Sequence, residues 1–199
     1  MVAAAVENFG RLDILFNNAG GFNGATILDM EEEQWNAVID VQLSGVVHCT
    51  QHAARQMISQ GSGGAIINMF GATGFCGMYG HANHAATKGA ILAATRSCAF
   101  ELRSHHIRVN AVRAKLRTEL MAPLIDQIRE HLKSAGEPHD VTARELEYYG
   151  PEEASGLVAW LASGLTSEIT GQLFGIDGPK LTHYGVYRKR QRDPVWRSG

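Results

Sequence analysis

The stretch Leu12-Asp13-Ile14-Leu15-Phe16-Asn17-Asn18-Ala19-Gly20 decides the fold of this chain. Its first part, residues 12–16, is a short and mostly apolar run, which is typical of a parallel strand buried on both faces. Residues 2–9 before it have a helical pattern that Gly10 ends. The chain is therefore expected to begin with a helix, followed by this strand.

The same alternation continues along the chain. Asp29-x-x-Glu32 predicts a capping box that opens a helix, which continues as a long helical stretch to about Met57. The further strands are predicted at residues 65–69, 107–112 and 172–176, and the further helices at residues 82–103 and 151–162. Strands that alternate with helices indicate a doubly wound α/β fold with a parallel sheet.

Composition narrows the class of protein. The chain has 199 residues, of which 45% are hydrophobic, and a net charge of -2, so we expect one domain, residues 1–199, with a substantial core. The near-neutral charge does not favour nucleic acid as a partner, and no apolar run approaches the roughly 18 residues that would span a membrane. Residues 1–9 lack the pattern of a secretory signal, so a cytoplasmic location is expected.

The cysteines are Cys49, Cys76 and Cys98, which are widely separated and form no C-x-x-C pair. They are expected to be small buried hydrophobic residues rather than disulfide partners or zinc ligands. His48 and His52, and likewise His81 and His84, have spacings that metals use, but no third ligand is placed by spacing. We therefore expect no metal site.

Short motifs carry a resemblance to a known family. They are Asn17-Asn18-Ala19-Gly20, the run Gly63-Gly64-Ala65-Ile66-Ile67-Asn68, Thr170-Gly171-Gln172 and Ile176-Asp177-Gly178. With these motifs the chain resembles the short-chain dehydrogenase/reductase (SDR) family along nearly its whole length. The resemblance implies a Rossmann-type parallel sheet and a relationship to NAD(P)-dependent alcohol and ketone oxidoreductases.

In that family Asn-Asn-Ala-Gly closes the fourth strand, and a glycine-rich turn after the first strand binds the pyrophosphate. The glycine clusters at residues 20–24 and 71–77 lack the spacing of such a turn and are expected to be loops. The resemblance therefore implies a partial sheet that lacks its first three strands, roughly 60 to 80 residues. Strand 12–16 then becomes an unpaired edge, and we expect a homo-oligomer or association with a homologous chain.

The family's catalytic residues are a serine, a tyrosine, a lysine and an asparagine. Counted onto this sequence, their positions are Gly71, His84, Lys88 and Gln42 in that order, so only the lysine is retained. The i, i+4 spacing of His84 and Lys88 places both on one face of a helix. Because a positioned donor and a general acid/base are missing, ordinary carbonyl reduction is expected to be close to undetectable.

The resemblance also implies NAD or NADP as the cofactor. The retained cofactor positions are Asn17, Ala19, Gly20, Lys88 and Thr118. Asn17 and Gly20 have an equally good structural explanation, because they finish a strand and a turn. The family's Pro-Gly after the Val-Asn-Ala-Val strand is replaced by Arg113-Ala114-Lys115, and without the glycine-rich turn the nucleotide lacks its main binding element.

Three functional hypotheses follow. The first is an SDR-family protein without competent redox catalysis as the chain stands. The second is an active enzyme, an oxidoreductase or a non-redox proton-transfer enzyme or lyase, that uses His84 and Lys88 with a nucleotide site completed by a partner chain. The third is a non-catalytic interaction or regulatory subunit.

Residues 118–150 are predicted to form a lid-like segment, and residues 179–199 a basic tail.

Overall fold

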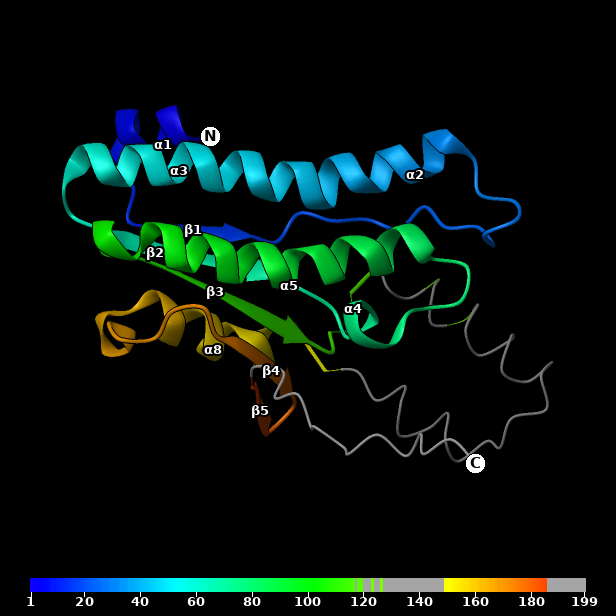
Figure 1. The fold of residues 1–199 in the computed structure, drawn as a ribbon. Coiled ribbons are helices and arrows are strands. Elements are labelled where there is room, and N and C mark those ends of the chain that lie inside the picture. The colour runs from blue at the N-terminus through cyan, green and yellow to red at the C-terminus, as the bar shows by residue number, and fades with distance from the viewer. Residues whose placement is uncertain (117, 120–122, 124–125, 127–148, 186–199) are drawn as a thin grey trace, which may run out of the picture.

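The computed structural model describes residues 1–116, 118–119, 123, 126 and 149–185. These residues form an α/β fold around one five-stranded sheet with the order β1-β2-β3-β4-β5 (Figure 1). The strands are β1 Ile14–Asn17, β2 Gly64–Met69, β3 Ile107–Ala114, β4 Leu173–Asp177 and β5 Lys180–Tyr184. The first four are parallel, and β5 is antiparallel to β4. The predicted α/β class with a Rossmann-type parallel sheet is confirmed.

Helices cover both faces of the sheet (Figure 1). The α-helices are α1 Val2–Phe9, α2 Glu32–Ile39, α3 Gly45–Gln60, α4 Thr73–Cys76, α5 Ala82–Leu102 and α8 Glu152–Ala162. A π-helical turn, Asp40–Ser44, joins α2 to α3, and two short 3-10 turns occupy Arg103–His105 and Gly164–Thr166. No helix of the described residues is long and apolar enough to cross a membrane.

The core is built on the two faces of β2. Ile66 and Ile67 are both fully buried, and successive residues of a strand point to opposite faces. Ile66 packs in a cluster with Met57 of α3, whereas Ile67 packs with Leu157 and Leu161 of α8. β2 therefore has the burial on both faces that is typical of a parallel strand between helical layers.

β1 differs from this expectation. Leu15 and Asn17 are buried, but Ile14 is 48% and Phe16 37% exposed. The prediction that this strand is buried on both faces is therefore wrong, because among the described residues no element covers the face that carries Ile14 and Phe16. The prediction that it is an edge is confirmed, since β1 pairs only with β2 within the described sheet.

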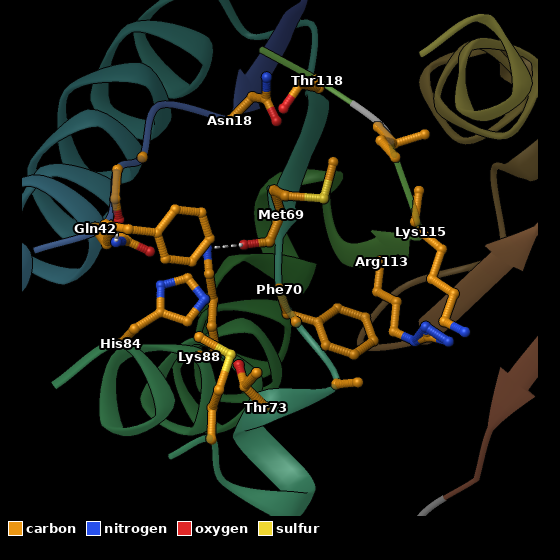
Figure 2. Close-up of a pocket in the computed structure, with 18 of the residues that line it drawn as sticks. Asn18, Gln42, Met69, Phe70, Thr73, His84, Lys88, Arg113, Lys115 and Thr118 are labelled. Atoms are coloured by element: carbon orange, nitrogen blue, oxygen red, sulfur yellow. Dashed lines mark hydrogen bonds between the residues drawn. The ribbon is translucent and has the colours of Figure 1, made fainter. Parts of the chain in front are cut away.

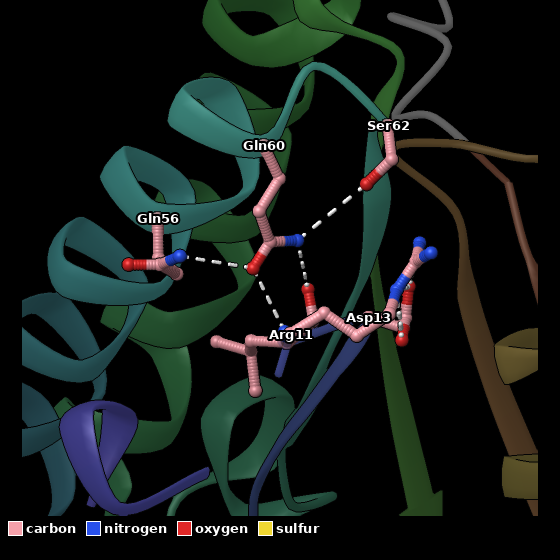
Figure 3. Close-up of polar contacts among 6 residues, drawn as sticks. Arg11, Asp13, Gln56, Gln60 and Ser62 are labelled. Carbon is pink, nitrogen blue, oxygen red and sulfur yellow. Dashed lines mark hydrogen bonds and ion pairs between the residues drawn. The ribbon is translucent and has the colours of Figure 1, made fainter. Parts of the chain in front are cut away.

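The segment that leads into β1 is held by a side chain of α3. Gln60 Oε1 accepts a hydrogen bond from Leu12 N at 2.8 Å, and Gln60 Nε2 donates to Leu12 O at 2.9 Å (Figure 3). Gln56 Nε2 donates to Gln60 Oε1 at 3.0 Å, which orients the Gln60 amide. One side-chain amide thus satisfies the backbone groups of Leu12 at the start of the edge segment.

The first long helix begins later than its sequence signal. The predicted box of Asp29 and Glu32 is wrong, because Asp29 accepts a hydrogen bond from the Thr26 hydroxyl at 2.5 Å and closes a turn there. Glu31 is the N-cap instead, and its backbone N–H donates to Gln34 Oε1 at 3.0 Å in a capping box.

Other boundaries also shifted. The glycine cluster at residues 71–77 contains the one-turn helix α4, so the loop prediction is wrong there. β3 runs two residues beyond its prediction because Arg113 and Ala114 pair with Gly175 and Ile176 of β4. Cys76 is exposed, against the expectation of burial, while Cys49 and Cys98 are partly buried.

The end of the described chain adds a strand that the sequence did not indicate. β5 occupies residues 180–184, within the segment predicted as a basic tail. The rest of that tail, residues 186–199, lies outside the described residues, as does most of the predicted lid at 118–150.

Candidate functional site

A cavity of about 410 Å³ lies at the carboxyl ends of β1, β2 and β3, which is where open parallel sheets bind their ligands. Its walls come from the loop after β1, the π-helical turn, the end of β2, α4, α5 and the end of β3 (Figure 2). The polar and charged side chains among its described lining residues are Asn18, Gln42, Thr73, His84, Lys88, Arg113, Lys115 and Thr118. None of the described lining residues is Asp or Glu.

Lys88 lies on α5 and is only 8% exposed. Its Nζ donates a hydrogen bond to the Met69 carbonyl at 3.3 Å (Figure 2). Burial lowers the pKa of Lys88 from 10.5 to about 8, because the ammonium loses hydration and no carboxylate among the described lining residues compensates. A substantial fraction of Lys88 is therefore neutral slightly above pH 7.

His84 lies one helical turn before Lys88 and is buried. Its pKa is lowered from 6.5 to about 4, mainly by burial, and further by the charges of Lys88 and His81. His84 Nδ1 is buried with no hydrogen-bond partner among the described residues, and the ring packs at 4.6 Å from the Phe22 ring. The structure thus brings His84 and Lys88 together, with the imidazole neutral at pH 7.

Gln42 reaches the cavity from the π-helical turn, which is a distortion often found at functional sites. It is 1% exposed. Its Nε2 donates to the Gly21 carbonyl at 2.5 Å, while its Oε1 is buried without a hydrogen-bond partner among the described residues. Gln42 therefore holds the loop after β1.

Gly71 provides no side-chain donor, and a serine there fits only if two neighbouring side chains shift. A Cβ built on Gly71 lies 3.2 Å from Lys88 Cγ and 3.2 Å from Thr73 Oγ1, so these side chains need to move by only a few tenths of an ångström. Thr73 Oγ1 is itself buried with no hydrogen-bond partner among the described residues. Sequence reasoning missed Thr73, whose only signal is its place two residues after Gly71.

The predicted cofactor positions separate into two groups. Gly20, Lys88 and Thr118 line the cavity, whereas Asn17 and Ala19 are not among its described lining residues. Asn18 lines it instead and was missed, although it stands in the same motif.

Asn17 has a structural role, because its side chain connects the sheet to the helices beside it. Its Nδ2 donates to Asn68 Oδ1 at 2.8 Å and to Thr50 Oγ1 at 3.2 Å. Asn68 Nδ2 in turn donates to Thr95 Oγ1 at 3.0 Å. This buried chain joins β1 to β2, α3 and α5, which supports the structural explanation of Asn17.

Arg113 stands where the family has part of a Pro-Gly segment, and its side chain connects β3 to β4 and β5. Its guanidinium forms a bidentate ion pair with Asp177, at 2.6 and 3.2 Å. Its Nε donates to the Tyr184 hydroxyl at 2.9 Å, and the Tyr184 ring stacks on Phe75 at 5.3 Å. One side of the cavity is thus bound to the β4–β5 hairpin.

Other sequence candidates lie elsewhere. His48 and His52 are exposed on α3. Within the described residues no three His, Cys, Asp or Glu side chains are grouped to hold a metal ion.

The fold agrees with comparisons to known proteins. A family model described as enoyl-(acyl carrier protein) reductase matches residues 1–178. The chain is 36% identical to the 3-oxoacyl-(acyl-carrier-protein) reductase FabG of Thermotoga maritima over 179 residues, which cover 89% of this chain and 70% of that protein. The corresponding protein of Staphylococcus aureus is 37% identical, with the same coverage.

Solved structures of similar proteins agree with this family match. An acetoin dehydrogenase from Enterobacter cloacae matches with a TM-score of 0.73 and 32% identity, over 89% of this chain and 67% of that one. A short-chain type dehydrogenase/reductase from Mycobacterium marinum matches with a TM-score of 0.77 and 33% identity, over 89% and 68%. The chain belongs to the short-chain dehydrogenase/reductase family.

Proposed function

We propose that this chain is an SDR-family protein, related to NAD(P)-dependent alcohol and ketone oxidoreductases, that lacks competent carbonyl reduction as it stands. The observation that carries the proposal is the composition of the cavity around Lys88. At the tyrosine position stands His84, whose imidazole has a pKa of about 4 and is a poor proton donor at pH 7. At the serine position Gly71 offers no hydroxyl.

The remaining polar groups of the cavity do not replace the missing catalytic residues. Gln42 occupies the asparagine position, but its amide N–H is engaged by the Gly21 carbonyl. Of the atoms nearest to a Cβ built on Gly71, one belongs to a hydroxyl, Thr73 Oγ1. Thr73 by itself replaces only one of the missing catalytic groups. Loss of a positioned donor and of the general acid/base lowers rates by on the order of 10⁴-fold or more.

The test is restoration of the family residues. The triple variant Gln42→Asn, Gly71→Ser, His84→Tyr is compared with the unaltered chain for reduction of acetoin and of a 3-oxoacyl thioester with NADH and with NADPH. We expect turnover by the unaltered chain below the detection limit, and turnover by the variant at least about 100-fold above that limit when the nucleotide titration shows that the variant binds the nucleotide.

The matched controls change the same residue types outside the cavity. Gly156→Ser lies on α8, where an added Cβ meets nothing within 4 Å, and His52→Tyr is exposed on α3. A nucleotide titration of each protein by fluorescence separates failed binding from failed chemistry. Efficient ketone reduction by the unaltered chain contradicts the proposal.

A second candidate is a subunit that works with a homologous chain, and the exposed edge β1 favours it. Ile14 and Phe16 present apolar surface beside backbone groups that no described strand pairs. Co-expression with an intact homologue tests this hypothesis. Stable co-purification without turnover by this chain supports a regulatory role, whereas nucleotide-dependent turnover that is lost in Lys88→Arg of this chain supports an enzyme that uses His84 and Lys88 with a nucleotide site completed by a partner chain.

A further inference from the structure

We propose that Lys88 is a nucleophilic lysine that condenses with small ketones in the cavity to form an imine, a reaction that needs no nucleotide. This activity goes beyond the proposed loss of reduction and does not depend on it. In this reaction the Lys88 amine forms a covalent bond to the substrate, whereas in the family the lysine assists a neighbouring tyrosine.

The geometry supplies the space and the access. Lys88 lines a cavity of about 410 Å³ together with apolar side chains such as Phe22, Phe70 and Met78, and this volume suits a small organic molecule. The replacement of serine by Gly71 leaves the lysine stem free of a side chain on that side, since a Cβ there approaches Lys88 Cγ to 3.2 Å.

The electrostatics keep the amine partly neutral. Lys88 Nζ donates a hydrogen bond to the Met69 carbonyl, which holds an ammonium less strongly than a carboxylate does. Burial lowers the pKa of Lys88 to about 8, so that about one amine in ten is neutral at pH 7. Desolvation in an apolar pocket is the standard way to activate a lysine nucleophile.

The reaction balances within the site. The neutral amine attacks the carbonyl carbon and forms a C–N bond, and proton transfer gives a carbinolamine. The carbonyl oxygen then leaves as water with the two protons that the amine nitrogen carried, and the C=N bond remains. The polar side chains of Asn18, Gln42, Thr73 and His84 line the same cavity as Lys88.

The experiment uses 2,4-pentanedione on the full chain without nucleotide. This diketone condenses with a neutral amine, and the imine rearranges to a stable conjugated enaminone, so no reductant is needed. Peptide mass spectrometry then locates the mass of the diketone less one water. At pH 7.5 we expect Lys88 to react at least about tenfold faster than the exposed Lys180, because the cavity holds the diketone beside an amine whose pKa burial lowers to about 8.

The pH profile and variants complete the test. Labelling of Lys88 is expected to rise with a midpoint near pH 8. Lys88→Arg abolishes the fast reaction, whereas Lys180→Arg leaves it unchanged. Peptide mapping of the unaltered chain keeps the test valid if Lys88→Arg fails to fold. No adduct on Lys88, or labelling of Lys88 no faster than of Lys180, overturns the proposal.

Discussion

At the scale of the residue, His84 shows how a buried site changes the chemistry of a side chain. Its ring packs on Phe22 and lies beside the Lys88 ammonium, so both burial and charge disfavour the imidazolium. The i, i+4 spacing predicted that the two side chains share a face, and their charge interaction in the structure agrees. Burial, which has the larger effect on the pKa, was not visible in the sequence.

The depressed pKa of His84 predicts acid sensitivity. Between pH 6.5 and about 4 the unfolded chain binds a proton that folded His84 does not, so stability falls as pH falls through this window. At pH 5 the contribution lost relative to pH 7 is on the order of 1 to 2 kcal/mol. We expect His84→Gln to reduce this loss, as measured by urea unfolding at pH 7 and pH 5.

His52→Gln is the control, because His52 is exposed on α3, and it should keep the acid sensitivity of the unaltered chain. If His84→Gln loses as much stability on acidification as the unaltered chain, the imidazole is not held neutral by the fold.

At the scale of the element, side chains decide where helices and strands begin and how they are held. Gln60 near the end of α3 binds both backbone groups of Leu12 (Figure 3). The π-helical turn between α2 and α3 carries Gln42 into the cavity. Neither feature follows from periodicity, because both depend on which segment lies beside the helix in space.

Removal of the Gln60 amide tests the first of these features. Gln60→Ala leaves Leu12 N and O without their side-chain partner, and we expect a loss of about 1 to 2 kcal/mol in the free energy of unfolding. The control is Gln51→Ala, on the exposed surface of the same helix. It makes the same change in helix propensity, from glutamine to alanine, and leaves the contact with Leu12 in place. Equal stability of the two variants in urea denaturation would show that the contact contributes nothing.

At the scale of the molecule, the sheet ends in two different ways within the described residues. On one side β5 closes the sheet as an antiparallel strand, tied through Tyr184 to Arg113. On the other side β1 is an edge with exposed Ile14 and Phe16. An edge with apolar side chains favours association.

We therefore expect the purified chain to sediment as a dimer or larger species. Ile14→Lys with Phe16→Lys should shift it toward the monomer, because lysines on an edge strand oppose pairing, and sedimentation velocity measures the shift. Leu165→Lys, which removes an apolar side chain that is 83% exposed on a 3-10 turn, should leave the association unchanged. A monomeric unaltered chain contradicts this expectation.

The sequence alone determined the alternation of strands and helices, the family, and the shared face of His84 and Lys88. These features follow from local periodicity and short motifs, which backbone geometry and burial impose directly on neighbouring residues. The tertiary structure alone decided that Asn17 bonds to Asn68 while Asn18 faces the cavity. It also decided that Arg113 pairs with Asp177, and that Lys88 is buried enough to lower its pKa. Such properties depend on which strand ends meet and how much water their packing excludes, and residues distant in sequence supply both.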